Sequence, residues 1–372
     1  MTTRRGFGRS VLGGLLFCSC GMLDGAHAQQ MRSQTEGGGT VLPIMIGGKR
    51  VRTIDTHAHC LFQDSLDLLS PDAAKAALPN TKGVREHFVG AEGAGVEQRL
   101  RAMDAMGVDV QVLSINPYWY RSDREVAQKI VAINNTRLSQ LCAQYPERFR
   151  AFASLTMQFP DLAVAQLDDA VRNKGLVGAA VGASMLGESY ADAKYDALWA
   201  KAEELGVTIF IHPQSTPELA KRYAGNGWLS NTIGNPLDTT IALSHFIFEG
   251  TLDKFPRLKV LSAHGGGFLG SSADRSDHAC FVSPQSCNPG IALKKRPSEY
   301  LNQIYFDALV FTPEALRHLM AQVGASQIVL GTDAPIPWEL HPVDHVLLTP
   351  MSDTDRVAIL GGNAAQLLGL VA

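Results

Sequence analysis

From residue 51 onwards the chain alternates between two hydrophobic patterns. Short apolar runs rich in β-branched residues predict buried strands, and most are followed by a stretch with apolar residues three and four positions apart, which predicts an amphipathic helix. We expect strands at residues 51–54, 108–114, 148–155, 176–183, 207–212, 258–264, 304–307 and 327–333. We expect helices at residues 96–106, 122–145, 162–172, 193–205, 236–255, 313–323 and 353–368.

This alternation predicts an α/β fold with a parallel sheet, because parallel strands are joined by helical crossovers. Eight strand–helix units within residues 51–372 favour a TIM-like (β/α)8 barrel. An open, doubly wound sheet is the alternative. No G-x-G-x-x-G motif follows the first strand, so the sequence does not support dinucleotide binding.

The N-terminal segment differs from the rest of the chain. Arg4-Arg5 precedes a weakly apolar run at residues 10–23, and Ala26-His27-Ala28 has the small-residue spacing of a cleavage site. This pattern predicts a Tat-type signal peptide over residues 1–28, and hence export to the periplasm. The run is shorter than the roughly 20 residues that span a bilayer, so we expect no membrane segment in the mature protein. The glycine-rich residues 29–50 predict a linker.

Composition limits the possible partners and the redox state. A formal net charge of −3 over 372 residues offers no basic surface, so we expect no nucleic-acid partner. The hydrophobic content of 45% is enough for one large core. Cys280 and Cys287 are close enough in sequence to form a small loop in an oxidising compartment. The sequence leaves this disulfide open.

Histidine and aspartate side chains stand at the C-terminal ends of four predicted strands. His57 and His59 follow the first strand, His212 ends the fifth, His264 the sixth and Asp333 the eighth. In a barrel all these ends face one mouth, where active sites lie. A single histidine at a strand end is usually a hydrogen-bonded structural residue. Five such groups at one mouth instead indicate a site that can bind a metal and move protons.

On these residues and their neighbours the chain resembles the amidohydrolase superfamily, in the branch of aminocarboxymuconate-semialdehyde decarboxylase. The resemblance extends from residue 51 to the C-terminus and implies the (β/α)8 fold. Its motifs are Asp55-Thr-His57-Ala-His59, Phe210-Ile-His212-Pro213, Ser262-Ala-His264-Gly-Gly-Gly267, Leu330-Gly-Thr-Asp333-Ala-Pro335 and Gly362-Asn363-Ala364.

For the metal, the resemblance implies one divalent ion, with zinc preferred and manganese as the alternative. Its ligands would be His57, His59, His212 and Asp333. Three neutral imidazoles and one carboxylate leave a zinc site with a net charge of about +1, which lowers the pKa of a bound water toward about 7. Superfamily members with two ions carry a modified lysine on the fourth strand, and residues 176–183 contain none. We therefore expect a single ion.

For catalysis, the resemblance implies that His264 transfers the proton, since an imidazole titrates near pH 6.5. Arg275, eleven residues after His264, would hold a substrate carboxylate, and Trp228 would pack on the substrate. Gln214 stands where the semialdehyde decarboxylase has tryptophan, which argues against that semialdehyde as the substrate. Asp307, at the end of the seventh strand, would either support a ligand histidine or cap the next helix.

The preferred function is non-oxidative decarboxylation of a small aromatic or unsaturated carboxylic acid. The substrate itself would delocalise the developing carbanion, so no organic cofactor is required. The alternative is a metal-dependent hydrolase or hydratase acting on a lactone, ester, amide or unsaturated acid, with Asp333 or His264 taking the proton. A binding protein without activity is the third hypothesis, and it would not require all five polar residues. We expect a homodimer.

Overall fold

The computed structural model of the protein describes residues 43–77, 94–214, 216–287, 289–338 and 341–370. The predicted signal peptide at residues 1–28 lies outside the described residues, and so do residues 29–42 of the predicted linker. The described end of that linker forms a short antiparallel hairpin, in which β1 (Met45–Ile46) pairs with β2 (Lys49–Arg50). The described residues all belong to one compact unit.

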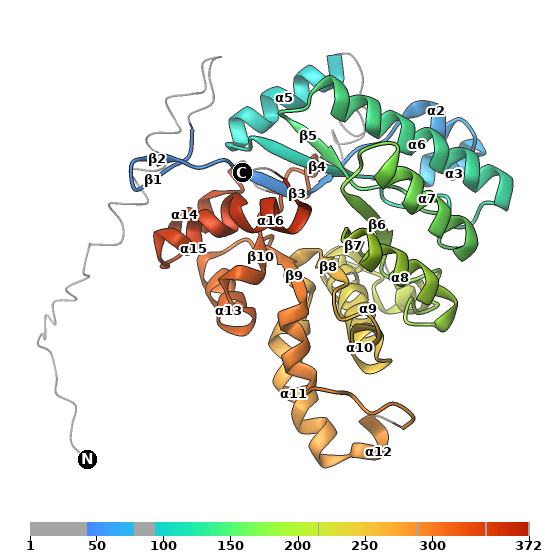
Figure 1. The fold of residues 1–372 in the computed structure, drawn as a ribbon, viewed down its shortest axis with the longest axis vertical. Coiled ribbons are helices and arrows are strands. Elements are labelled where there is room, and N and C mark those ends of the chain that lie inside the picture. Colours follow the sequence, from blue (N-terminus) through green and yellow to red (C-terminus); the bar gives the residue numbers. More distant parts are fainter. Residues whose placement is uncertain (1–42, 78–93, 215, 288, 339–340, 371–372) are drawn as a thin grey trace, which may run out of the picture. The chain divides into compact units, whose positions relative to one another are not determined.

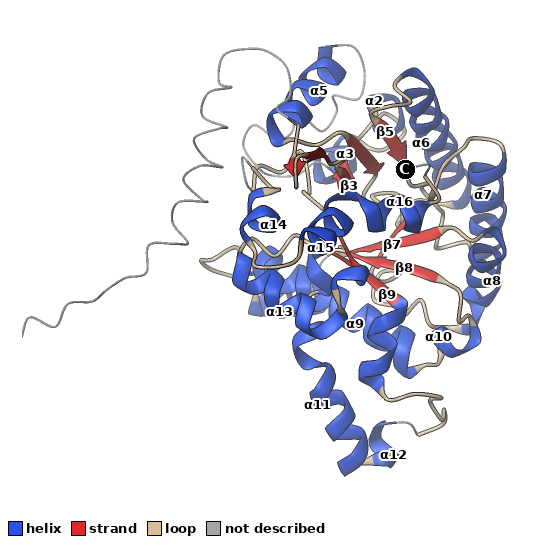
Figure 2. Cartoon of the chain, turned by 60° about the vertical axis from the view of Figure 1, so that its left-hand side comes forward, coloured by secondary structure: helices blue, strands red, loops and turns tan. Residues whose placement is uncertain are grey.

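Eight parallel strands form a closed barrel with helices outside it (Figures 1 and 2). A bridge between Ala153 and Ala179 joins the two sheets on one side. On the other side the backbone N–H of Thr56 donates to the carbonyl of Leu330 at 2.9 Å. This closure confirms the (β/α)8 barrel and excludes the open sheet. The strands are β3 (Ile54–His59), β4 (Val110–Ser114), β5 (Phe149–Ala151), β6 (Gly178–Gly182), β7 (Thr208–His212), β8 (Lys259–Ser262), β9 (Ile304–Asp307) and β10 (Ile328–Val329).

The helices mostly lie where the hydrophobic spacing predicts them, with shifts of a few residues at their ends. Local chemistry sets two of these ends. The carboxylate of Asp123 accepts a hydrogen bond from the backbone N–H of Val126 and begins α6, and Gly206 ends α8 in the left-handed conformation. The longer helices are α5 (Ala94–Met106), α6 (Arg124–Gln144), α7 (Pro160–Arg172), α8 (Asp196–Leu205), α9 (Asn235–Phe248), α11 (Leu269–Val282) and α13 (Pro313–Val323).

Shorter helices fill the connections and complete the chain. The predicted helix at residues 353–368 is divided by a π-helical turn into two parts. The predicted helix at residues 236–255 is likewise interrupted, at a left-handed Gly250. The short helices are α2 (Gln63–Leu66), α3 (Pro71–Ala77), α10 (Thr251–Lys254), α12 (Pro284–Cys287), α14 (Asp344–Leu348), α15 (Asp353–Val357) and α16 (Asn363–Leu368).

The core has two parts, as a barrel requires. The larger cluster lies between the outer faces of the strands and the surrounding helices. The smaller one fills the barrel, and Leu367 and Leu368 of α16 pack against it from the end opposite the site. The members of this inner cluster that come from the strands, or from the residue just after one, are Ile54, Val110, Val112, Phe152, Ala180, Phe210, Leu261, Ala263 and Val329.

The first barrel strand differs from its predicted position at residues 51–54. It begins at Ile54 and includes both histidines, with a break in its register against β4 between Asp55 and Ala58. Successive side chains of a strand point to opposite faces. Because Ile54 points into the barrel, unbroken alternation would direct His57 and His59, three and five positions later, to the outside. An irregularity of this kind exchanges the two faces and turns His57 and His59 inward.

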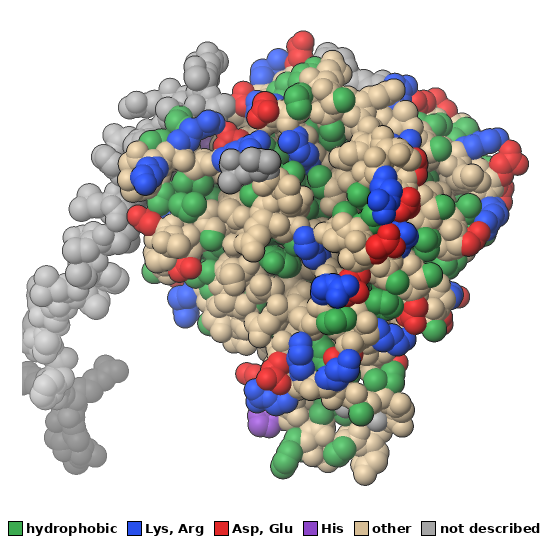
Figure 3. All heavy atoms as spheres, viewed as in Figure 1, with side chains coloured by type: hydrophobic (Ala, Val, Ile, Leu, Met, Phe, Trp, Pro, Cys, Tyr) green, Lys and Arg blue, Asp and Glu red, His purple; other side chains and the backbone are tan. Residues whose placement is uncertain are grey.

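One arm extends from the barrel and was not predicted as helix. It consists of α11 and α12, which are joined by a disulfide between Cys280 and Cys287 (Figure 1). Phe281 and Val282 near its tip are exposed. On the face drawn in Figure 3, basic and acidic side chains are interspersed. Among the described helices, none is long and apolar enough to cross a bilayer.

Candidate metal centre

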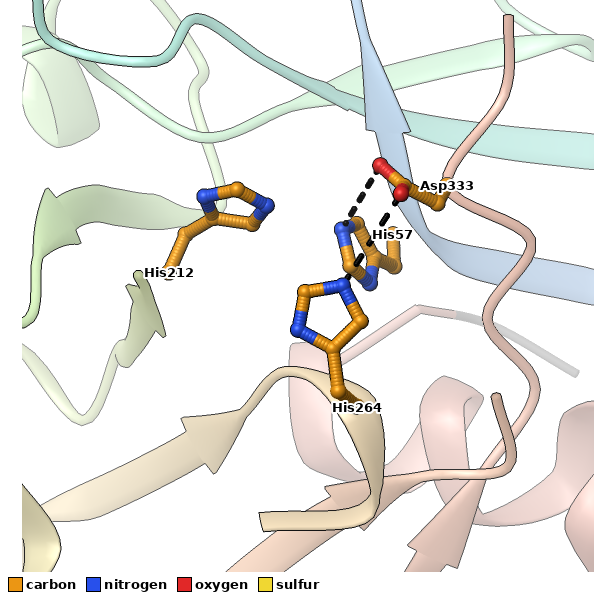
Figure 4. Close-up of side chains that lie close together, drawn as sticks. All are labelled: His57, His212, His264 and Asp333. Carbon is orange, nitrogen blue, oxygen red and sulfur yellow. Dashed lines mark ion pairs between the residues drawn. The ribbon is translucent and has the colours of Figure 1, made fainter. Parts of the chain in front are cut away.

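Five polar side chains converge at the C-terminal end of the barrel, as the sequence predicts. Figure 4 shows His57, His212 and His264 directed toward Asp333. One potential ligand atom from each of these four residues lies within 4.8 Å of all the others. His59 joins them, since its Nε2 atom lies 3.1 Å from Nε2 of His57 and 3.0 Å from Oδ1 of Asp333. Residues almost 280 positions apart therefore share one small volume.

The spacing of these atoms suits a cation. Atom Oδ1 of Asp333 lies 3.3 Å from Nε2 of His57. This is close to the distances of 3.1 and 3.0 Å from Nε2 of His59 to Nε2 of His57 and to Oδ1 of Asp333. Ligand atoms about 2.0–2.1 Å from a tetrahedral zinc ion are roughly 3.3 Å apart. In addition, neither ring nitrogen of the buried His212 has a hydrogen-bond partner among the described residues. A buried imidazole without a partner is costly unless a further group binds it.

Asp307 orients the ring of His57 and holds the backbone at His264. The Nδ1–H group of His57 donates to Oδ2 of Asp307 at 2.7 Å, which leaves Nε2 facing the centre. The same oxygen accepts the backbone N–H of His264 at 2.9 Å, and Oδ1 accepts that of Gly265 at 2.8 Å. Asp307 is fully buried. Of the two roles left open for it, the structure shows support of a histidine.

A second buried carboxylate connects the strands beneath the site. Asp55 accepts the side-chain hydroxyl of Thr332 at 2.7 Å and the amide of Gln111 at 3.0 Å. It thereby links β3 to β4 and to the segment that carries Asp333. Burial raises the pKa of Asp55 to about 6, although these hydrogen bonds oppose the shift. Apart from its position next to the histidines, nothing in the sequence indicates this role of Asp55.

The electrostatics match the protonation states that metal ligands need. Burial lowers the pKa of His59, and burial together with the neighbouring imidazoles lowers the pKa of His212 well below its usual range. Burial would raise the pKa of Asp333, but the charge of His57 and hydrogen bonds from the imidazoles hold it well below its usual range. Two neutral imidazoles and one carboxylate are therefore already present in the protonation states that bind a metal.

His57 is the exception. Burial would lower its pKa, but the carboxylates of Asp333 and Asp307 raise it to about 10. Its Nδ1–H group is held by Asp307, so the additional proton belongs on Nε2, which faces Asp333. A cation at the centre would take the place of that proton.

The backbone is strained at two of these residues. His264 and Asp333 have φ angles of 55° and 58°, in the left-handed region that side chains other than glycine rarely adopt. Such strain occurs at functional sites, where the surrounding structure maintains it. Gly331 makes the close packing possible, because a Cβ atom there would lie 2.8 Å from Cβ of Asp307 and 3.0 Å from Cβ of His57.

A pocket of about 330 Å³ opens beside the metal centre. His264 is at one side of it, and the walls are mainly apolar and aromatic. The other residues that line it are Asn231, Thr232, Asn235, Pro236, Gly267, Phe268, Leu309, Val310, Phe311 and Trp338.

Two predicted substrate residues lie outside this lining, as far as the described residues show. Arg275 is exposed on α11. Trp228 is half exposed and stacks on Trp338, with ring centroids 5.7 Å apart and planes at 23°. Trp338 itself lines the pocket, and its position in a proline-rich loop gave no indication of this in the sequence.

Comparisons with known proteins agree with this geometry. A family model described as amidohydrolase matches residues 54–370. The 2-amino-3-carboxymuconate-6-semialdehyde decarboxylase of Dictyostelium discoideum is 31% identical over 276 residues, which cover 73% of this chain and 76% of the relative. The gamma-resorcylate decarboxylase of Rhizobium sp. (strain MTP-10005) is 31% identical over 288 residues, which cover 74% and 87%.

A solved structure adds a metal and a ligand to the comparison. It is a dihydroxybenzoic acid decarboxylase from Polaromonas sp. JS666 with bound manganese and the inhibitor 2-nitroresorcinol. The two folds agree with a TM-score of 0.73 at 27% sequence identity, over 86% of this chain and 97% of that chain. In that relative, therefore, this fold holds a divalent ion together with a planar aromatic molecule.

Proposed function

Because the chain belongs to the amidohydrolase family, we propose that it is a metal-dependent, non-oxidative decarboxylase of a small aromatic carboxylic acid. The observation that carries this proposal is the convergence of His57, His59, His212 and Asp333 beside an apolar pocket that also contains His264. The relatives support the reaction type, since the Dictyostelium and Rhizobium proteins described above are both decarboxylases.

In this proposal, metal binding and proton transfer belong to different residues of the site. His57, His59, His212 and Asp333 would hold one divalent ion, which supplies positive charge that fixes and polarises substrate oxygens. His264 would carry a proton on Nε2 and deliver it to the ring carbon as the bond to the carboxylate breaks. The carboxylate leaves as carbon dioxide, and the electron pair of the broken bond accepts the proton. His264 then regains a proton from water.

The donor set is the basis for our proposal of zinc. Imidazole and carboxylate are ordinary zinc ligands, while manganese, present in the Polaromonas relative, is the alternative. His264 lies near enough to the centre that it could also bind the ion. Its assignment as the proton donor therefore needs the separate test described in the Discussion.

Three further proposals concern the protein as a whole. We propose export to the periplasm through the twin-arginine signal, and the disulfide between Cys280 and Cys287 supports an oxidising compartment. We also propose a homodimer, supported by the exposed apolar tip of the α11 arm. Arg275 is exposed on that arm and does not line the pocket beside His264. Its role in binding a substrate carboxylate therefore stays a prediction.

The function is tested by incubating the metal-loaded protein with a panel of hydroxybenzoates and a panel of lactones and esters. We expect carbon dioxide and the corresponding phenol from at least one hydroxybenzoate. The first to examine is 2,6-dihydroxybenzoate, which is the gamma-resorcylate named for the Rhizobium relative. Asp333→Ala is the control and should lose both the metal and the activity. Release of acid from a lactone or ester, without carbon dioxide from any benzoate, would establish the hydrolase instead.

A further inference from the structure

Trp338 contacts Asp333 from outside the histidine cluster. Its indole Nε1–H donates to Oδ2 of Asp333 at 2.7 Å. Oδ2 also lies 3.8 Å from Nε2 of His264, while Oδ1 of the same carboxylate faces Nε2 of His57 and His59. The two oxygens of Asp333 thus have different surroundings. An indole N–H can only donate, so it is compatible with Asp333 as a carboxylate with an unprotonated Oδ2.

The loop after β10 is folded so that Trp338 returns over Asp333. The backbone N–H of Ile336 donates to the carbonyl of Asp333, and that of Trp338 donates to the carbonyl of Ile336, both at 2.9 Å. Pro335 and Pro337 limit the backbone freedom of the same segment. The indole is thereby held near the carboxylate that it contacts, five residues earlier in the chain.

The ring of Trp338 is also supported by other aromatic side chains. Trp228 stacks on it in a nearly parallel arrangement, and Phe311 meets it edge-on, with ring centroids 5.8 Å apart at 62°. Both Trp338 and Phe311 line the pocket that contains His264. An aromatic surface held in this way presents a flat, apolar wall to a ligand next to His264.

We propose that Trp338 is a positioning residue with two effects on the site. Its N–H group holds Oδ2 of Asp333, so that Oδ1 is presented to the metal. Its ring, backed by Trp228, forms a flat wall for the substrate, which selects planar aromatic acids over open-chain unsaturated acids. The second effect rests on the proposed function, whereas the first concerns metal binding alone.

The test uses two variants of Trp338 in the full-length protein. Trp338→Phe keeps an aromatic ring and removes the N–H group, and Trp338→Leu removes both. Affinity for Mn²⁺ is measured by competition with a chromophoric chelator. Binding of 2-nitroresorcinol is then measured by calorimetry at saturating Mn²⁺. Neither measurement requires turnover, so the first effect can be judged even if no benzoate is decarboxylated.

We expect Trp338→Phe to weaken Mn²⁺ binding by about 10- to 100-fold, the usual effect of losing a group that orients a metal ligand. Its affinity for 2-nitroresorcinol should change by less than about threefold, because the wall remains. Trp338→Leu should weaken Mn²⁺ binding similarly and also weaken 2-nitroresorcinol binding by about tenfold or more, from the loss of an aromatic contact.

Trp199→Phe is the matched control. Trp199 is buried on α8, and its indole N–H donates to the carbonyl of Tyr190 at 2.9 Å, so the variant loses an equivalent hydrogen bond away from the site. Its Mn²⁺ affinity should equal that of the wild type. Wild-type Mn²⁺ affinity in Trp338→Phe would overturn the first effect. Wild-type affinity for 2-nitroresorcinol in Trp338→Leu would overturn the second.

Discussion

At the scale of single residues, the site depends on which ring nitrogen each histidine presents to the centre. Asp307 holds Nδ1 of His57, and Oγ of Ser114 lies 3.0 Å from Nδ1 of His59, so both rings present Nε2. His212 instead presents nitrogens with no hydrogen-bond partner among the described residues. Groups outside the ligand set therefore decide the geometry, because an imidazole held at one nitrogen has a fixed ring orientation.

The proton-transfer role of His264 is testable by substitution. We expect His264→Asn to retain the metal and to lower kcat by about 10²–10⁴-fold, the usual effect of losing a positioned proton donor. Metal content is measured by elemental analysis alongside steady-state kinetics. Loss of the ion in this variant would instead make His264 a ligand, and near-normal kcat would remove it from the mechanism.

Metal binding should release a proton from His57. The pKa of His57 near 10 means that the metal-free protein keeps this imidazole protonated at neutral pH. A metal ion needs the neutral form, so affinity should rise with pH by about tenfold per unit below pH 10. Calorimetry at pH 7 in two buffers of different ionisation enthalpy should show about one proton released per ion. No proton release would contradict this assignment.

At the scale of elements, the strand ends and the loops after them place the functional groups. The break in β3 turns its histidines inward, and β10 is only two residues long before its chain continues to Asp333. Asn363, at the start of α16, holds the backbone at the beginning of β10, the end of that strand opposite to Asp333. Its amide donates to the carbonyls of Ala325 at 2.8 Å and Ile328 at 2.7 Å.

Asn363→Ala should therefore destabilise the protein. The substitution leaves two carbonyl groups without their donors, at a cost of about 1–3 kcal/mol in the free energy of unfolding. Urea denaturation followed by circular dichroism measures the change. Gln366→Ala is the control, because Gln366 lies on the same helix but is exposed, and it should have little effect. Equal stability of the two variants would contradict this account.

At the scale of the whole molecule, the candidate metal centre brings together residues from strands at the start, middle and end of the barrel sequence. His57 and His59 come from β3, His212 from β7, and Asp333 from the segment after β10. An ion bound to all of them binds the folded state but no preformed site in the unfolded chain. The ion should therefore stabilise the fold as a unit.

Removing the metal should lower the melting temperature. With the ion at about 1,000 times its Kd, binding contributes about 4 kcal/mol, which corresponds to a shift of roughly 6 °C for a unit of this size. Differential scanning calorimetry with and without a chelator measures the shift. Asp333→Ala should melt at the same temperature in both conditions. An unchanged wild-type melting temperature, once metal loss is verified, would show that the ion does not connect these strands.

The sequence by itself determined the barrel and the identity of the converging side chains. Alternating periods of hydrophobicity are local properties, and a parallel barrel brings every strand's C-terminal end to one mouth. His57, His59, His212, His264 and Asp333 could therefore be predicted to meet. Even so, the strand carrying His57 was placed too early, since a break in register leaves no local hydrophobic signal.

Only the tertiary structure decided the partners of those side chains. Asp307 acts on His57 across the contact between β9 and β3, and Trp338 acts on Asp333 within the loop after β10. Both contacts depend on how the chain folds and packs rather than on hydrophobic spacing. The same holds for α11, whose polar and small residues give little periodic pattern, and for the exposed position of Arg275 on it. A motif identifies the groups that perform the chemistry, whereas packing determines which atom of each group is available for it.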